Sequence, residues 1–270
     1  MGLTDGEKNA ACEFFQTLQK TLMDAIASVD GKAKFVETPW DRPEGGGGTM
    51  AVLRGEVIEK AGVNRSRVSG ARYPGLEEEH AGKPYFAAGI STIGHAFNPH
   101  APIGHMNVRL LEVGEQFWVG GGADLTPCFP VDKDTRLFHD AFRDACERHP
   151  CGGIVNYEKF SKWCDEYFYI PHRKSIRGVG GIFFDYLKGS FDELFPFIQA
   201  VATAYARVYP TILERRKDTP FDESDREKLL YWRGRYAEYN LIYDRGTKFG
   251  LMTGGNVDAI FVSLPPIVKW

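Results

Sequence analysis

The first part of the chain carries apolar residues at the spacing of an amphipathic helix. These residues are Phe14, Leu18, Leu22 and Ile26. They recur at every fourth position and therefore share one helical face. Before them, Thr4 is followed three residues later by Glu7, which is the capping-box pattern of a helix start, and Asp30 and Gly31 form a stop signal. We expect a helix that begins near residue 5 and ends near residue 30.

The pattern changes between residues 49 and 119. Short apolar segments are now bounded by Gly, Pro and Asn, which is typical of strands. The clearest of these segments are residues 50–53, 85–90, 108–113 and 116–119. The glycine run at residues 45–48 precedes them and predicts a flexible loop.

Helical spacing returns after residue 130. Residues 132–148 and 157–168 are predicted to form helices, and residues 180–185 a short buried strand. Ser190 repeats the capping-box pattern and opens a long helix toward residue 215. Pro210 is expected to kink or end that helix.

The C-terminal part alternates like a strand. Residues 235–243 place successive side chains on two different faces, and a turn signal follows at residues 244–246. Residues 247–252 then return as a second strand. We interpret the pair as a β-hairpin. Residues 259–264 are predicted to form a last apolar strand.

These elements come in blocks and do not alternate strictly. Their order is helix, strands, helices, strand, helix and hairpin. It favours the α+β class, with a large, mainly antiparallel sheet covered by helices. Because the chain shows neither an internal repeat nor a linker, residues 1–270 are predicted to form one domain.

Composition narrows the class of protein. The net charge of -3 argues against a nucleic-acid binder, since phosphate binding usually requires a basic excess. The chain contains no apolar run of about 18 residues, so no membrane span is predicted. The five cysteines form no C-x-x-C motif and fit reduced thiols. Since the acidic N-terminus resembles neither a signal nor a transit peptide, we expect a cytoplasmic protein.

Three polar residues enter one of the predicted strands. His105, Asn107 and Arg109 alternate with apolar residues, so they should project from the same face of a sheet. An imidazole, an amide and a guanidinium in one row could bind and protonate an anionic ligand. An exposed polar sheet face would have the same pattern, and the spacing leaves both interpretations open.

Residues 120–124 combine three glycines, an alanine and Asp124 after a predicted strand. Glycine allows positive φ and lets a ligand approach the backbone. The segment lacks the dinucleotide pattern G-x-G-x-x-G and the Gly-Lys-Ser/Thr of a phosphate loop. Taken alone, such a glycine-rich turn is more often structural than functional.

Further groups could recognise anions. The cations Arg173, Arg177, Arg245 and Lys248 could grip carboxylates, and residues 254–256 offer backbone N–H groups. The alternative is solvated charge at a sheet edge.

Four histidines are candidate metal ligands: His95, His105, His139 and His172. Their spacing matches no compact ligand motif such as H-E-x-x-H. Ordinary surface or hydrogen-bonded histidines are the alternative interpretation.

Five blocks of the chain, taken together, resemble the oxygen-dependent coproporphyrinogen III oxidase family. They are residues 118–127 (W-V-G-G-G-A-D-L-T-P), 162–173 (K-W-C-D-E-Y-F-Y-I-P-H-R), 177–185 (R-G-V-G-G-I-F-F-D), 233–255 (R-G-R-Y-A-E-Y-N-L-I-Y-D-R-G-T-K-F-G-L-M-T-G-G) and 263–266 (S-L-P-P). The similarity covers nearly the whole chain from about residue 10. Long blocks in order are far more specific than any single motif above.

The resemblance implies an enzyme of heme and porphyrin biosynthesis. The reaction would be the oxidative decarboxylation of two propionates of coproporphyrinogen III to vinyl groups, with dioxygen as oxidant and protoporphyrinogen IX as product. The resemblance also implies a homodimer and a flat antiparallel sheet with helices on both faces. It implies that no cofactor is required for the chemistry, although some family members are proposed to bind a divalent metal.

Position by position, the resemblance places the proton-donor histidine at His105 and the catalytic aspartate at Asp124. Substrate contacts fall on Ser91, Asn107, Val108, Arg109, Gly254, Gly255 and Asn256. The proposed metal ligands fall on His95, His105, His139 and His172. Some relatives have arginine at position 256, so one contact with a substrate carboxylate is expected to be neutral here.

These residue types suit the implied chemistry. An aspartate with a pKa of about 3.9 is a poor base toward a neutral pyrrole, so Asp124 is expected to stabilise positive charge on the macrocycle. Arg109 would hold the reacting propionate, and His105 would protonate the reduced oxygen species. Two other functions stay open: a metal-dependent oxygenase that uses the histidines, and a non-catalytic tetrapyrrole carrier.

Overall fold

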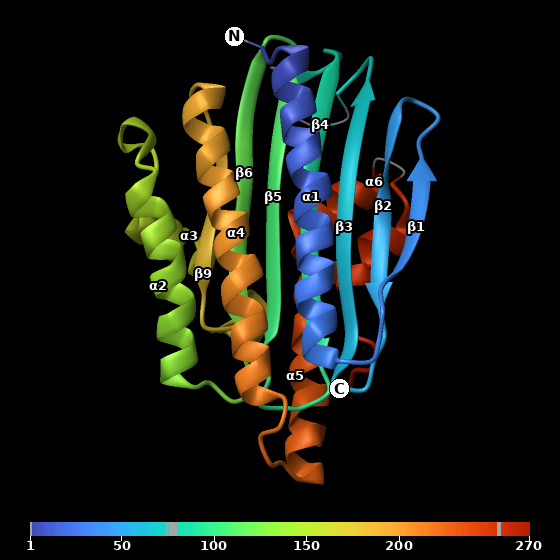
Figure 1. Cartoon of the computed structure of the whole chain (residues 1–270), viewed down its shortest axis with the longest axis vertical. Helices are drawn as coiled ribbons and strands as arrows, with labels where there is room; N and C mark the ends of the chain where they lie inside the picture. Colours follow the sequence, from blue (N-terminus) through green and yellow to red (C-terminus); the bar gives the residue numbers. More distant parts are fainter. Residues whose placement is uncertain (1, 74, 76–79, 253–254) are drawn as a thin grey trace.

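The computed structural model describes residues 2–73, 75, 80–252 and 255–270, and its centre is an antiparallel sheet of seven strands. The strand order is β1-β2-β3-β4-β5-β6-β9 (Figure 1). The strands are β1 (Val36–Asp41), β2 (Gly46–Leu53), β3 (Ile58–Gly70), β4 (Tyr85–Ala96), β5 (Ile103–Val113), β6 (Gln116–Thr126) and β9 (Gly181–Leu187). A separate two-stranded sheet joins β7 (Tyr169–Ile170) and β8 (Ser175–Ile176).

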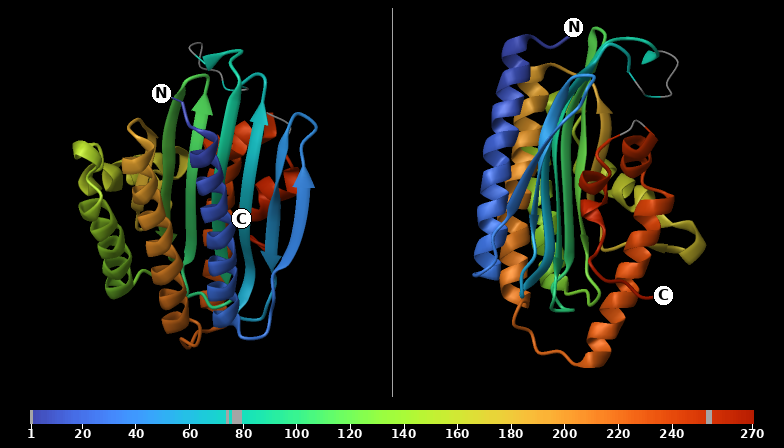
Figure 2. Two further views of the ribbon diagram at one scale, coloured as in Figure 1. Left: turned by 45° about the horizontal axis from the view of Figure 1, so that its top comes forward. Right: turned by 90° about the vertical axis from the view of Figure 1, so that its right-hand side faces the viewer.

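Helices cover both faces of this sheet (Figures 1 and 2). One face carries α1 (Asp5–Asp30), α2 (Asp132–Arg148) and α4 (Phe191–Arg216). The other carries α5 (Glu223–Ile242), α6 (Arg245–Met252) and α7 (Val257–Ile260), followed by the short 3-10 turn η4 (Phe261–Ser263). The turns η2 (Cys151–Gly153) and η3 (Pro171–Arg173) flank α3 (Tyr157–Tyr167) and β7. The predicted α+β class, with helices on both faces, is confirmed.

The apolar core lies between the sheet and α1 with α4. Met106, Val108 and Leu110 of β5 are fully buried on this side. Tyr209 of α4 reaches the sheet and donates its hydroxyl to the Gly94 carbonyl over 3.0 Å. Strand periodicity therefore directs every second residue of β5 into this core and leaves the residues between them on the opposite face.

Helix α3 (Tyr157–Tyr167) covers the β9 edge of the sheet. Its Phe160 ring lies 5.4 Å from the ring of Phe184, on the side of α4. Its Tyr167 ring stacks on Phe183 at 4.0 Å, on the side of α5. The edge strand is thus closed by aromatic side chains on both of its faces.

The start and end of α1 agree with the sequence pattern. Thr4 Oγ1 accepts a hydrogen bond from the Glu7 backbone N–H, and the Glu7 carboxylate accepts one from the Thr4 backbone N–H. Gly31 ends the helix at a φ of 80°, a left-handed conformation that favours glycine. The predicted helix at residues 132–148 coincides with α2, and the predicted helix at 157–168 ends one residue earlier, as α3.

The predicted C-terminal hairpin is wrong. Residues 235–243 lie largely in α5, and residues 247–252 lie in α6. The buried positions of α5 include Leu229, Arg233, Tyr236 and Asn240, which follow helical spacing. Two of these four are polar, so hydropathy alone concealed the buried face of the helix. The predicted strand at residues 259–264 is likewise wrong, because this segment forms α7 and η4.

Pro210 is predicted to kink or end its helix. It does not end α4, which continues to Arg216 because Tyr209, Ile212 and Leu213 around it are buried in the core. The glycine run is not a loop, since three of its residues begin β2. A Cβ atom at Gly48 would lie 2.6 Å from the Trp40 ring, so the glycine allows this tryptophan to cross the strand.

Candidate active site

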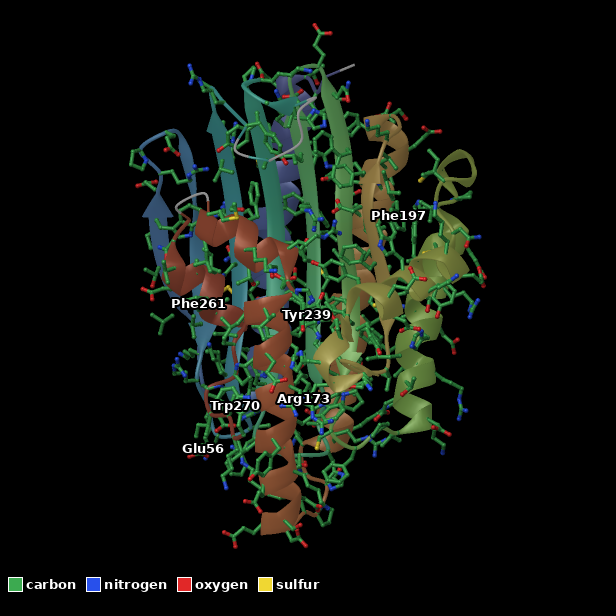
Figure 3. All side chains as sticks on the ribbon, turned by 180° about the vertical axis from the view of Figure 1, so that it is seen from behind. Glu56, Arg173, Phe197, Tyr239, Phe261 and Trp270 are labelled. Atoms are coloured by element: carbon green, nitrogen blue, oxygen red, sulfur yellow. The ribbon has the colours of Figure 1, made fainter. Side chains whose placement is uncertain are left out.

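The predicted row of polar residues lies on the face of the sheet that α5 covers. His105, Asn107 and Arg109 of β5 are partly exposed, whereas their neighbours Met106 and Val108 are buried against the other layer. Figure 3 shows this face, with Tyr239 of α5 in front of the strands. The expectation that the three polar residues share a face is confirmed.

The neighbouring strands place predicted site residues beside this row. Asn107 is paired with Ser91 of β4 and with Gly122 of β6. His105 is paired directly with Asp124. In antiparallel pairing, opposed residues share one face, so the glycine–aspartate segment and the polar row form a single surface. The sequence pattern favoured a turn after a strand at residues 120–124. This segment instead lies in the interior of β6.

Asp124 accepts hydrogen bonds from two different cationic or titratable groups. His105 Nδ1 lies 2.9 Å from Asp124 Oδ1, and Arg177 Nη2 lies 2.8 Å from Asp124 Oδ2. Thr126 Oγ1 approaches Oδ2 at 3.4 Å. Arg177 comes from the segment between β8 and β9, so two distant parts of the chain hold one carboxylate.

The charges around Asp124 determine the protonation of the cluster. Burial alone would raise the pKa of Asp124, but the Arg177 charge and the hydrogen bond from His105 outweigh burial and keep that pKa below its ordinary value. An ionised carboxylate only accepts hydrogen bonds, so His105 must donate through Nδ1. Its Nε2 atom has no hydrogen-bond partner within the described ranges, and it is the atom left for exchange with a ligand.

Arg177 is buried within a cage of aromatic side chains. Its guanidinium lies 3.9 Å from the centre of the Phe168 ring, 4.4 Å from that of Tyr236 and 4.8 Å from that of Tyr239. Arg177 Nη1 also donates to Asn240 Oδ1 over 3.0 Å. Burial would lower the pKa of Arg177, but the Asp124 charge raises it above its usual value. The sequence suggested that Arg177 could bind a substrate carboxylate. Its side chain is only 2% exposed, so it supports Asp124 instead.

Arg109 is more accessible than Arg177. Its side chain is 36% exposed. Nη1 donates to Asn107 Oδ1 over 2.9 Å, and Nη2 lies 2.8 Å from Asp185 Oδ2. Gly120 lies beneath this ion pair, where a Cβ atom would come within 2.4 Å of Asp185 Oδ1. The glycine therefore provides the space in which the two charged side chains meet.

The segment after α6 approaches the same row through β3. Asn64 is paired with Ser91, and its amide donates to the Ala259 carbonyl over 2.8 Å. Asn256 caps α7 by accepting from the Ala259 backbone N–H at 3.1 Å. Asn64 thus connects the segment that contains the predicted contacts Gly255 and Asn256 to Ser91, the neighbour of the polar row. The predicted contact Gly254 lies outside the described residues.

Val108 differs from the other predicted contacts. Its side chain is fully buried among the core residues under α1 and α4. The side chain therefore faces away from the polar row, and Val108 can offer a ligand on that row only its backbone.

The four candidate metal ligands do not come together. His95 Nε2 bonds to the Ser263 carbonyl at 3.0 Å, and His139 bonds to the Tyr157 hydroxyl and the Val179 carbonyl. His172 bonds to Tyr243 and Glu238, whereas His105 bonds to Asp124. Within the described residues, no group of three or more His, Cys, Asp or Glu side chains could hold a metal ion. The part of the chain that the structure describes therefore does not bring the four histidines together.

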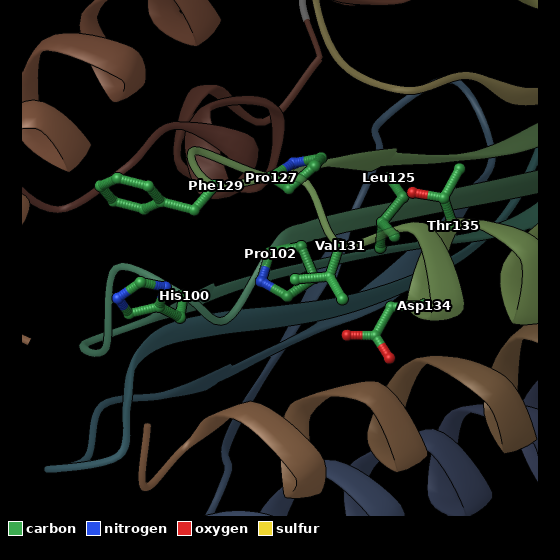
Figure 4. Close-up of a pocket in the computed structure, with 8 residues that line it drawn as sticks. All are labelled: His100, Pro102, Leu125, Pro127, Phe129, Val131, Asp134 and Thr135. Carbon is green, nitrogen blue, oxygen red and sulfur yellow. The ribbon is translucent and has the colours of Figure 1, made fainter. Parts of the chain in front are cut away.

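A small pocket lies elsewhere, near the end of β6 (Figure 4). It is lined by His100, Pro102, Leu125, Pro127, Phe129, Val131, Asp134 and Thr135. None of these residues belongs to the polar row. The chemistry of the chain therefore points to the face around Asp124 and not to this pocket.

Comparison with known proteins identifies the family. The model of the family described as Coproporphyrinogen III oxidase matches residues 10–270. The chain belongs to the coproporphyrinogen III oxidase family. It is also 47% identical over 271 residues to the oxygen-dependent coproporphyrinogen-III oxidase of Rickettsia bellii (strain OSU 85-389), a match that covers 97% of this chain and 94% of the relative.

As a member of the coproporphyrinogen III oxidase family, the chain has its polar row, Asp124 and the supporting residues within the matched range. Sequence reasoning did not find Asn240 or Asp185 as parts of this surface. The signal for Asp185 is its place at the end of an apolar strand, directly after two phenylalanines. Asn240 gave no such signal, because the pattern around it suggested a hairpin.

Proposed function

We propose that this chain is an oxygen-dependent coproporphyrinogen III oxidase. It converts two propionates of coproporphyrinogen III to vinyl groups and yields protoporphyrinogen IX for heme synthesis. For each propionate, R–CH2–CH2–COOH and O2 give R–CH=CH2, CO2 and H2O2, so the side chain loses two electrons and dioxygen gains them. The observation that carries the proposal is the buried Asp124, held between His105 and Arg177 beside the open Arg109.

In this proposal Asp124 acts by its charge. Three groups already donate to the carboxylate, which offers about four acceptor positions, so one pyrrole N–H can still be bound. The negative charge is fixed before the reaction and stabilises positive charge that develops on the electron-donating macrocycle. The same carboxylate holds His105 with its proton on Nδ1, because it accepts from that atom.

His105 is the proton donor of the proposed reaction. Its Nδ1 proton is held by Asp124, so Nε2 is the atom that exchanges protons with the reduced oxygen species. Its side chain is 22% exposed, which is enough to meet a ligand on the sheet surface.

Arg109 binds the reacting propionate until carbon dioxide leaves. A guanidinium binds carboxylates through charge-assisted hydrogen bonds, and the side chain of Arg109 is partly exposed. We further propose that Ser91, Asn107 and the backbone at residues 255–256 contact the remaining propionates or the pyrrole edge. No resident cofactor is part of this proposal, since the electron-rich macrocycle itself reduces dioxygen.

We also propose that the enzyme is a cytoplasmic homodimer. Large apolar side chains are exposed on and near α6, which supports a contact between two copies there. They are Leu241, Ile242, Phe249, Leu251, Met252 and Val257. The five cysteines are free thiols, as in reducing compartments. In the part of the chain that the structure describes, no helix combines the length and apolar character that crossing a membrane requires.

One assay tests the proposed activity. The purified protein is incubated with coproporphyrinogen III under air and under argon, and the product is oxidised and quantified by fluorescence. The proposal is supported if turnover occurs under air, does not occur under argon and does not fall when a chelator is added. Binding without turnover would indicate a carrier, and activity abolished by the chelator would indicate a metal-dependent oxygenase.

A further inference from the structure

Asp185 already occupies the carboxylate-binding atoms of Arg109. Its Oδ2 lies 2.8 Å from Arg109 Nη2 and 4.0 Å from Arg245 Nη2. The Asp185 side chain is only 11% exposed, whereas Arg245 is 58% exposed. The surface therefore holds two guanidinium groups and one internal carboxylate, an arrangement that resembles an arginine site with an anion already bound.

The backbone is shaped to aim Asp185 at this position. The register between β6 and β9 shifts between Val119 and Gly121, which marks a β-bulge in β9 at Asp185 and Tyr186, opposite Gly120. The next residue, Tyr186, has a φ of 52°, a left-handed conformation that is uncommon for a tyrosine. Asp185 Oδ1 accepts from the Tyr186 backbone N–H at 3.0 Å. Bulges commonly redirect a side chain, and strained residues persist where surrounding contacts enforce them.

Two neighbours enforce the strained conformation. The Tyr186 ring stacks on Trp118 at 5.4 Å, and Gly120 leaves open the space that the Asp185 carboxylate fills. Trp118 and Gly120 lie on the same face of β6, two residues apart. Sheet register, backbone strain and a required glycine thus all place this carboxylate against Arg109.

We propose that Asp185 is a stand-in for the reacting propionate and thereby a specificity-determining residue. In the empty site it neutralises Arg109, and an incoming propionate displaces it. When the propionate leaves as carbon dioxide, the vinyl product has no charge to hold Arg109, and Asp185 returns. Only a side chain that carries a carboxylate competes with Asp185, so a position already converted to vinyl is not retained. This inference rests on the proposed function, because it assumes that Arg109 binds the reacting propionate.

The test compares two stable oxidised porphyrins as probes. Coproporphyrin III carries four propionates, whereas protoporphyrin IX carries vinyl groups at the two reacting positions. Binding is followed by quenching of protein tryptophan fluorescence for the wild type, Asp185→Asn and Asp185→Ser. Asparagine and serine both remove the charge, and either can accept from the Tyr186 N–H. Asp134→Asn is the matched control, because Asp134 pairs with Arg215 and Arg216 on the other side of the sheet.

We expect both Asp185 variants to bind coproporphyrin about three- to tenfold more tightly, since a competing charge-assisted hydrogen bond is gone. Protoporphyrin binding should stay unchanged, and sodium propionate should inhibit turnover at lower concentration than in the wild type. Asp134→Asn should match the wild type with each ligand. Unchanged or weaker coproporphyrin binding in folded Asp185 variants would overturn the inference, because Asp185 would then merely position Arg109.

A structural measurement on the wild type does not depend on the folding of any variant. In a crystal structure with bound coproporphyrin III, Arg109 Nη2 should contact a propionate and have separated from Asp185 Oδ2, which otherwise lies 2.8 Å from it. An intact ion pair in that complex would overturn the inference. A wild-type protein that neither binds coproporphyrin nor turns over coproporphyrinogen would instead refute the proposed function itself.

Discussion

Arg177 Nη2 lies 2.8 Å from Asp124 Oδ2, and the two side chains are 2% and 5% exposed. Removing one partner of such a buried pair leaves an uncompensated charge in the interior. Asp124 therefore contributes to folding as well as to the proposed chemistry. An experiment on Asp124 has to separate the two effects.

Asp124→Ala should lower the free energy of unfolding by about 3–5 kcal/mol, because Arg177 stays buried without its partner. Urea denaturation followed by circular dichroism measures this change. Turnover should also fall to the background rate at temperatures where the variant is folded. A variant as stable as the wild type would show that the ion pair does not stabilise the fold.

The double variant Asp124→Leu with Arg177→Met should recover most of the lost stability while staying inactive. It replaces a buried ion pair with apolar side chains, which is often neutral or stabilising. Restored turnover in this variant would rule out an electrostatic role for Asp124.

Arg109→Ala should raise KM for coproporphyrinogen by about ten- to a hundredfold, since a hydrogen bond to a charged group contributes about 1.5–3 kcal/mol. Steady-state kinetics under air measure the change. Arg143→Ala is the control, because Arg143 forms an ion pair with Glu158 far from the polar row. Equal KM values for the two variants would remove Arg109 from the substrate site.

His105→Gln should lower kcat by about a hundred- to ten-thousandfold, the range typical for loss of a general acid or base. The pH profile of kcat should also change, because the variant lacks the group that transfers the proton. Coproporphyrin binding should change little, because glutamine can still donate to Asp124. A preserved pH profile in His105→Gln would assign the proton transfer to another group.

Glu238 makes the stability of the chain sensitive to acid. Hydrogen bonds from Arg173 lower its pKa to about 2, with burial opposing them and His172 adding to them. A depressed carboxyl pKa stabilises the fold above the unfolded value and loses that contribution as the pH falls through the folded value. This part of the stability should therefore disappear between about pH 4.5 and pH 2.

Glu238→Gln should lower the free energy of unfolding by about 1 kcal/mol at pH 6 and by almost nothing at pH 2. The expected value at pH 6 is small because the partner Arg173 is partly exposed. Thermal unfolding across this pH range measures the difference. Glu158→Gln provides the control, since its side chain is 70% exposed. A constant difference between Glu238→Gln and the wild type at every pH would contradict the assignment.

The polar row was predictable because strand alternation is a local property of the sequence. His105, Asn107 and Arg109 are two residues apart, and any strand through them gives one face. The long helices were predictable for the same reason, since their caps and apolar spacing are local.

The helix α5 was not predictable because its buried face is partly polar. Arg233 is fully buried and bonds to Glu59 of β3 over 2.7 Å, while Asn240 bonds to Arg177. Tertiary partners supplied by distant segments make these residues interior. The local hydropathy pattern cannot reveal those partners, because they are distant in the sequence.

The stand-in role of Asp185 was not predictable either. It depends on a bulge in β9, on a glycine in β6 and on an arginine in β5 that meet only in the folded sheet. The register that aligns them cannot be predicted from the sequence pattern of any one strand alone.

The strand order has a consequence for the order of assembly. From β1 to β6, each strand pairs with the next strand in the chain, so these pairings close short loops at little entropic cost, whereas β6 also pairs with the distant β9. The contact between Asp124 and Arg177 spans 53 residues, and Asn240 must arrive later still to complete it. Asp124 is thus expected to pair within the sheet while still hydrated, before the docking of α5 withdraws it from water. Maturation of the active site should consequently be the last slow step of folding, after the sheet itself has formed.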